Sequence, residues 1–274
     1  MRVKARSWYR VALATKAGPV QMVLASGEHM GQAIAEAVKQ LPESWAIAVD
    51  VATAEEIPLG ESVGKGHVVR LGDAQAPLDQ FKFPPGVLPA VQGGVTGMQV
   101  GWIERADPRL FVVEAQVEAD QLVDLYLGLV ERLPAADNLE VRILDHFESA
   151  ATTDVWLTSR VNARKIIRFL DDHDVELFGN GHLELGVYVR AHKATLRLTQ
   201  HKTVVWVGEE RALASELAQW LTELKVPRVA ELPTVEAGAH HHFRTASGRD
   251  RKKLSDELYK QRLRKVDTLK RSDA

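Results

Sequence analysis

The stretch from residue 182 to residue 207 limits the fold of this chain more than any other feature, because its side chains alternate between apolar and polar. Leu185, Val187 and Val189 occupy every second position of the first part, with polar side chains between them. Successive side chains of a β-strand point to opposite faces, so this pattern predicts a strand with one buried face. The pattern repeats around Leu196 and Leu198 and then in VVWV. We therefore predict a meander of three antiparallel strands with one apolar and one polar face.

The remaining chain supplies helices and further strands. Two short apolar segments, a helix that stops at Pro42 and a strand at 45–51 form a small β-β-α-β unit near the N-terminus. From Trp102 to Pro227 the predicted order is β-α-β-β-α-β-β-β-α. We expect an α+β fold in which a mainly antiparallel sheet has helices packed on one face. The first six elements follow the split βαβ order of ferredoxin-like folds.

Composition shifts along the chain predict four segments. Residues 1–60 hold the small β-β-α-β unit, and residues 61–100 are rich in proline and glycine and read as a linker or a wrapping loop. Residues 101–232 form the α+β domain that ends with the meander. Residues 233–274 form an irregular segment followed by a basic helix.

Composition also narrows the class of protein. The 274 residues are 45% hydrophobic and 26% charged, which is usual for a globular protein. There is no cysteine, which excludes disulfides and thiolate metal sites and suits a reducing compartment. No apolar run has the length of a secretory signal or of a membrane-spanning helix. We expect a cytoplasmic protein without a membrane span; the oligomeric state stays open.

The last 31 residues are strongly basic. From Arg244 to Ala274 there are 11 Lys/Arg and 5 Asp/Glu, whereas the whole chain has a net charge of −2. Residues 252–271 fit one amphipathic helix, with Lys253, Lys260, Arg264 and Arg271 in one arc and apolar residues, including Leu258 and Leu263, on another side. Such a helix can bind an anionic surface, a partner protein or an apolar groove. The alternative is a terminal helix that packs on its own domain.

The polar face of the meander is a second candidate binding surface. Aromatic and basic groups on an open sheet bind single-stranded nucleic acid, because bases stack on rings and phosphates pair with cations. The candidate residues are Tyr188, Arg190, His192, Arg197, His201 and Trp206. The alternative is that helices or the proline- and glycine-rich segment cover this face and that Tyr188 and Trp206 belong to the core.

Neither a metal site nor a catalytic signature is predicted. In an extended segment His240 and His242 face one way and His241 the other, so at most two of them can bind one ion, and no HExxH pattern accompanies them. No GxSxG sequence surrounds a serine. A hydrolase or phosphotransfer enzyme would use His192, His201 and Arg190, which would then have to converge in one pocket. No cofactor is expected.

The function predicted from these features is that of a non-enzymatic binding or adaptor protein. Its basic C-terminal helix would engage an anionic or helical partner, which could be a protein. Single-stranded nucleic-acid binding on the meander face is the first alternative, and the histidine- and arginine-dependent enzyme is the second.

Overall fold

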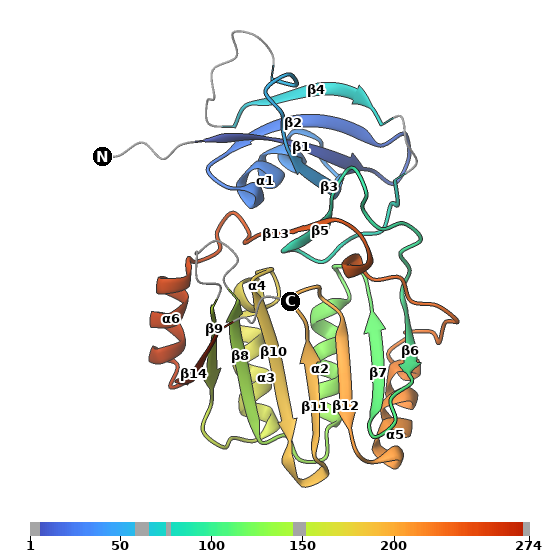
Figure 1. Ribbon diagram of the computed structural model, residues 1–274, viewed down its shortest axis with the longest axis vertical. Coiled ribbons are helices and arrows are strands. Elements are labelled where there is room, and N and C mark those ends of the chain that lie inside the picture. Colours follow the sequence, from blue (N-terminus) through green and yellow to red (C-terminus); the bar gives the residue numbers. More distant parts are fainter. Residues whose placement is uncertain (1–5, 58–65, 75–77, 145–151, 271–274) are drawn as a thin grey trace. The chain divides into compact units, whose positions relative to one another are not determined.

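The computed structural model describes residues 6–57, 66–74, 78–144 and 152–270 (Figure 1). The chain forms two compact units, of which the first comprises residues 1–98 and 233–247 and the second residues 99–232 and 248–274. Each contains an antiparallel sheet and helices, so the predicted α+β class is confirmed. The segment 233–274, predicted as one C-terminal piece, is divided between the two units.

The first unit is built on a four-stranded sheet with the order β3-β1-β2-β4. Its elements are β1 (Ser7–Ala14), β2 (Gln21–Gly27), α1 (Met30–Gln40), β3 (Trp45–Val51) and β4 (Val68–Asp73). The β-β-α-β order read from the sequence is present, and β4 adds an edge strand from the segment expected to be a linker. Ala33 and Ala37 of α1 are fully buried, because their small side chains let the helix lie close to the sheet.

Residues 78–98 of the proline- and glycine-rich segment also belong to the first unit. Phe81, Phe83 and Leu88 are each less than 10% exposed. The short strand β5 (Val87–Pro89) pairs antiparallel with β13 (His240–His242), which follows the 3₁₀ turn η2 (Val235–Ala237). After β13 the backbone passes so close to α1 that a Cβ atom on Gly31 would clash with the carbonyl oxygen of Arg244. Glycine is therefore needed at this position.

The second unit is an eight-stranded antiparallel sheet with the order β14-β9-β8-β10-β11-β12-β7-β6. Its strands are β6 (Gly101–Arg105), β7 (Phe111–Gln116), β8 (Asn138–Leu144), β9 (Thr152–Leu157), β10 (Leu183–Val189), β11 (Ala194–Leu198), β12 (Val204–Gly208) and β14 (Arg264–Lys270). Its helices are α2 (Leu122–Arg132), α3 (Ala163–Asp172), α4 (Asp174–Leu177), α5 (Arg211–Glu223) and α6 (Arg251–Lys260), with the 3₁₀ turn η1 (Arg190–His192).

The helices bury one face of this sheet. Leu185, Val187 and Leu196 are at most 1% exposed and belong to one apolar core with residues of α2, α3, α5 and α6. The hydroxyl of Tyr126 on α2 donates to the carbonyl oxygen of Leu196 over 3.2 Å, so its polar end is satisfied inside the core. The strands of the predicted meander thus supply the centre of the core.

The spatial order of the strands can be compared with the split βαβ order predicted from the sequence. The order β-α-β-β-α-β is present along the chain from β7 to β10. The crossover through α3 joins the parallel strands β9 and β10, with β8 between them, which is a split βαβ unit. By contrast, β10, β11 and β12 separate β7 from β8. The strand β6, which the sequence reading did not identify, closes the β7 edge.

The C-terminal residues do not form the single helix predicted for 252–271. Helix α6 ends at Lys260, Arg262 has a φ of 66°, and β14 then pairs with β9. Leu258 and Leu263 are 2% and 1% exposed within the core of the second unit, so they are not available to a partner. The helical reading fails because the partner strand β9 lies about a hundred positions earlier in the sequence, where local periodicity cannot detect it.

The charged residues expected to bind a partner are dispersed by this change. Lys253 and Lys260 are exposed on α6, each 3.9 Å from a carboxylate three residues away, whereas Arg264 begins β14. Arg271 lies outside the described residues. The four cations therefore do not form one helical arc.

Asp154 of β9 holds the C-terminal segment in place. Arg251 Nη2 lies 3.0 Å from one carboxylate oxygen, and Lys265 Nζ lies 2.7 Å from the other. Burial raises the pKa of Asp154, but hydrogen bonds and charges from Lys265 and Arg251 outweigh it and leave the pKa below its ordinary value. The basic C-terminal segment thus docks on an acidic group of its own unit.

We expect Leu258→Ala to destabilise the second unit by about 2–4 kcal/mol, because it removes buried methyl groups and leaves a cavity. Tyr259→Ala is the matched control, since the neighbouring Tyr259 is 73% exposed and its loss should change stability by no more than about 0.5 kcal/mol. Denaturant unfolding of both variants measures the difference. Equal effects would show that α6 is not part of the core.

Candidate functional site

The face of the large sheet opposite the helices is the candidate site. We call this surface the open face, and the strand register aligns its side chains in two rows that run across the strands. The first row contains Tyr188, Thr195, Val207, Val112 and Arg105. The second row contains Leu157, Glu140, Arg197, Val205, Glu114 and Ile103. Glu184 and Arg142 lie opposite each other beside the second row. In the described part of this unit, Figure 1 shows α2 and α3 on one side of the sheet and no helix on the other. The open face is thus a broad surface of mixed polarity.

Each arginine of the open face is paired with a carboxylate. Arg142 Nε donates to Glu140 Oε1 over 2.6 Å, and Arg105 Nε donates to Glu114 Oε2 over 2.7 Å. Arg197 Nη2 lies 3.5 Å from Glu184 Oε2. These three pairs leave the charge of the open face balanced.

Tyr188 is the aromatic residue of the two rows, and its hydroxyl takes part in this charge pattern. Its hydroxyl donates to Glu140 Oε2 over 2.7 Å. Burial raises the pKa of Tyr188, and the hydrogen bond and the charge of Glu140 raise it further. The phenol therefore stays protonated at neutral pH and acts as a hydrogen-bond donor that fixes Glu140.

Two of the six residues predicted for the polar face lie on it, namely Tyr188 and Arg197. Arg190 and His192 form η1 beyond the end of β10, and His201 lies in the turn between β11 and β12. His192 Nδ1 lies 3.0 Å from Glu210 Oε2 at the start of α5.

The placement of Trp206 on the polar face is wrong. Trp206 is 1% exposed and pairs across the strands with Leu196, so its ring lies in the core, while Val205 and Val207 lie on the open face. The turn after Leu198 decides this assignment. The turn places Leu198 opposite Val204, so Trp206 lies opposite Leu196 on the core face. Alternation within β11 and within β12 does not reveal the register between the two strands, because the turn sets it.

The histidines proposed for catalysis do not form one site. His192 precedes β11 and His201 follows it, so the length of that strand separates them, which is roughly 17 Å for five residues. The backbone N–H of Arg190 donates to Asp137 at the η1 end. The predicted set of His192, His201 and Arg190 therefore lacks the convergence that its enzymatic reading requires.

Lys202 is a buried titratable group that the sequence reading missed. Its side chain is 2% exposed, although it lies next to His201 in the β11–β12 turn, and its Nζ donates to the carbonyl oxygen of Asn180 over 2.8 Å. Burial lowers the pKa of Lys202 to about 7, although the negative charge of Glu184 acts in the opposite direction. No local sequence signal marks it, because the fold alone directs a turn lysine inward.

Asn180, which accepts the hydrogen bond from Lys202, belongs to a series of buried polar residues joined by hydrogen bonds. Asn180 Nδ2 donates to Glu176 Oε1 over 3.0 Å, and the backbone N–H of Arg249 donates to Glu176 Oε2 over 3.0 Å. Asn180 and Glu176 are both less than 10% exposed. Lys202 thus secures a hairpin turn to the segment around α4, which gives it a positioning role.

We expect Lys202→Met to change how stability depends on pH. In the unfolded chain the lysine has its ordinary pKa near 10.4, whereas in the folded chain it is about 7. The unfolded state therefore binds more protons between these values, and the stability of the unmodified protein rises as the pH rises. Lys202→Met removes this pH-dependent contribution to the free energy of unfolding. The difference in free energy of unfolding between the unmodified protein and the variant should therefore change by on the order of 2 kcal/mol between about pH 7 and about pH 9.5.

Denaturant unfolding at the two pH values measures this change. Lys193→Met is the control, because Lys193 also has a positive φ in a hairpin turn but has an exposed side chain. If the difference in free energy of unfolding between the two proteins is the same at both pH values, Lys202 has the same protonation in the folded and unfolded states over this pH range.

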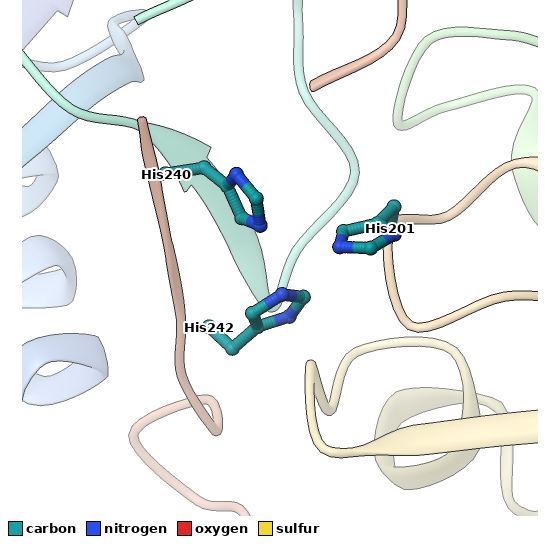
Figure 2. A group of neighbouring side chains, drawn as sticks. All are labelled: His201, His240 and His242. Carbon is teal, nitrogen blue, oxygen red and sulfur yellow. The ribbon is translucent and has the colours of Figure 1, made fainter. Parts of the chain in front are cut away.

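Among the described residues of the first unit, His240 and His242 belong to a group of side chains that could hold a metal ion. His240 and His242 present their rings on the same side of β13, with centroids 5.0 Å apart (Figure 2). His241 points away from them, with its Nε2 3.0 Å from Asp50 Oδ1. This is the alternation expected from the sequence. Figure 2 also labels His201, which belongs to the second unit.

Comparisons with known proteins give no family. No family model matches the chain, and no curated protein or solved structure matches it either. Among the described residues, every helix is too short or too polar to cross a membrane. The interpretation of function therefore depends on the two units themselves.

Proposed function

We propose that this protein is a non-enzymatic binding protein that associates with a second copy of itself through the open face. The observation that carries this proposal is the charge pattern of the face, in which each arginine is paired with a glutamate around a group of valines. The C-terminal segment, which the sequence analysis suggested as the binding element, instead packs into the core of the second unit. The proposal therefore moves the binding surface from the tail to the sheet.

The charge balance favours a protein partner of mixed charge. In a two-fold symmetric dimer the same patch meets itself, so it must carry both signs to be self-complementary. The Glu184–Arg197 and Glu114–Arg105 pairs supply both signs on one surface. A surface of one sign would repel its own copy.

The apolar part of the face supplies the association energy. Val112 and Val207 are cross-strand neighbours, and Val205 lies opposite Glu114 in the next row. All three are only partly buried within the chain, so a partner can remove the rest of their surface from water. Burial of apolar area gives roughly 25 cal/mol per Å² before the costs of association are subtracted.

The size of the face is adequate for a stable dimer. Eight strands spaced about 4.8 Å apart and about 20 Å long cover roughly 750 Å². A standard protein interface buries about 600 to 1,000 Å² on each partner. The open face is therefore large enough without contributions from the first unit.

Single-stranded nucleic acid remains the second candidate for the same face. Tyr188 could stack on a base, and Arg142 and Arg197 could contact phosphates. Each of these arginines already has a glutamate partner, so phosphates would have to compete with those carboxylates. The paired charges thus favour self-association over a polyanion.

We expect the full chain to dimerise reversibly and Val207→Arg to weaken the dimer by at least about tenfold. In the dimer this substitution adds a cation without a partner from each copy, and each must lose water on association. Sedimentation over about 1 to 100 μM protein measures the dissociation constant. Val175→Arg is the matched control, since Val175 on α4 is already 63% exposed.

Thermal unfolding shows whether Val207→Arg is folded before its association is measured. A chain that stays monomeric over the whole concentration range, or a Val207→Arg variant that dimerises as well as the unmodified chain, would contradict the proposal. Anisotropy of a labelled oligothymidylate tests the second candidate. Salt-dependent binding that Arg197→Ala weakens would replace self-association with nucleic-acid binding.

A further inference from the structure

We propose that His240 and His242 form a binding site for a divalent transition-metal ion of the zinc class. The site lies in the first unit and is independent of the open face. Imidazole nitrogen is a preferred ligand of Zn²⁺, Co²⁺, Ni²⁺ and Cu²⁺. Two imidazoles on one side of a strand form a chelate, with the remaining coordination positions filled by water or by further ligands.

The spacing of the two rings suits one ion. One ring nitrogen of His240 and one of His242 lie within 4.8 Å of each other. Two nitrogens bound at about 2.05 Å in a tetrahedral zinc site are about 3.3 Å apart. Small rotations about the side-chain bonds close this difference, because the rings already lie on the same side of β13 (Figure 2).

The hydrogen bond of His240 sets its tautomer. Nδ1 lies 2.8 Å from the carbonyl oxygen of Gly238. A carbonyl oxygen only accepts, so Nδ1 carries a proton, and in the neutral ring the lone pair is then on Nε2. This is the arrangement in which metal-binding histidines are usually held, with one nitrogen hydrogen-bonded to the protein and the other directed to the ion.

The middle histidine holds the strand in position. His241 Nε2 contacts Asp50 Oδ1, while Arg10 Nη2 lies 3.0 Å from Asp50 Oδ2. On either side of β13, the backbone N–H of Ala90 donates to Ala239 and that of Phe243 donates to Gly86. The strand is therefore fixed by backbone pairing at both ends and by the contact between His241 and Asp50, so little ordering is needed when an ion binds.

The nitrogen donors of His240 and His242 determine which class of ion the site selects. Asp50 contacts His241, whose ring points away from His240 and His242. An ion at His240 and His242 meets imidazole nitrogen donors from the strand. This donor set selects transition ions over Ca²⁺ and Mg²⁺, which require oxygen ligands.

Metal titration of the full chain tests the site. Zn²⁺ is titrated calorimetrically after removal of bound metal with a chelator, and Co²⁺ is used for its visible spectrum. We expect one ion per chain, at least about tenfold weaker binding in His240→Ala and in His242→Ala, and no saturable binding in the double variant. His192→Ala is the control with one histidine fewer, because His192 lies in an exposed turn of the second unit beside Glu210.

Two further measurements separate this site from weak binding to scattered histidines. X-ray absorption of the zinc-loaded chain should show at least two imidazole ligands, and Zn²⁺ should raise the melting temperature of the unmodified chain but not that of the double variant. Single replacement of the other histidines identifies any further imidazole ligand. Absence of saturable binding in the unmodified chain, or equal binding in the double variant, would overturn the proposal.

Discussion

The antiparallel register of the eight-stranded sheet is the constraint on which the second unit depends. A shift by one residue would turn every side chain to the other face, exposing the leucines and valines of β10 and β11 and burying the arginine–glutamate pairs. Burying the three ion pairs would remove their charges from water, and this desolvation penalty can exceed the attraction within each pair. The apolar core behind the sheet and the charge pattern in front of it therefore fix the same register. This makes the open face as well defined as the core.

The C-terminal segment shows how an unusual charge distribution can serve folding instead of binding. Its excess of basic residues led to a prediction of an external anionic partner. Asp154 forms ion pairs with Arg251 and Lys265, and Glu176 forms one with Arg249. Acidic groups of the same unit therefore neutralise part of the basic charge. The net charge of a segment predicts the sign of the charge on its partner but not whether that partner lies in the same chain or in another molecule. The intramolecular alternative, weighed from the sequence, is the one that the structure shows.

The sequence predicted the face on which a side chain lies correctly where that face depends on the residue's own strand. Tyr188 and Arg197 were placed correctly on the polar face, and the alternation of His240, His241 and His242 was foreseen. Trp206 was misplaced because the turn after Leu198 decides how β11 and β12 face each other. Lys202 could not be identified, because only the packing around the turn directs its side chain inward. Residues after a turn or at a sheet end are thus the least predictable.

By itself the sequence determined the α+β class, the small N-terminal β-β-α-β unit and the central strands of the large sheet. These features follow from local periodicity, since strands alternate every two residues and helices repeat every 3.6. Only the tertiary structure decided that β14 completes the sheet beside β9, that residues 233–247 return to the first unit and that β13 pairs with β5. The physical reason is that each depends on pairing between residues far apart in the chain. Such pairing is fixed by the free energy of the whole fold and leaves no periodic trace in the sequence.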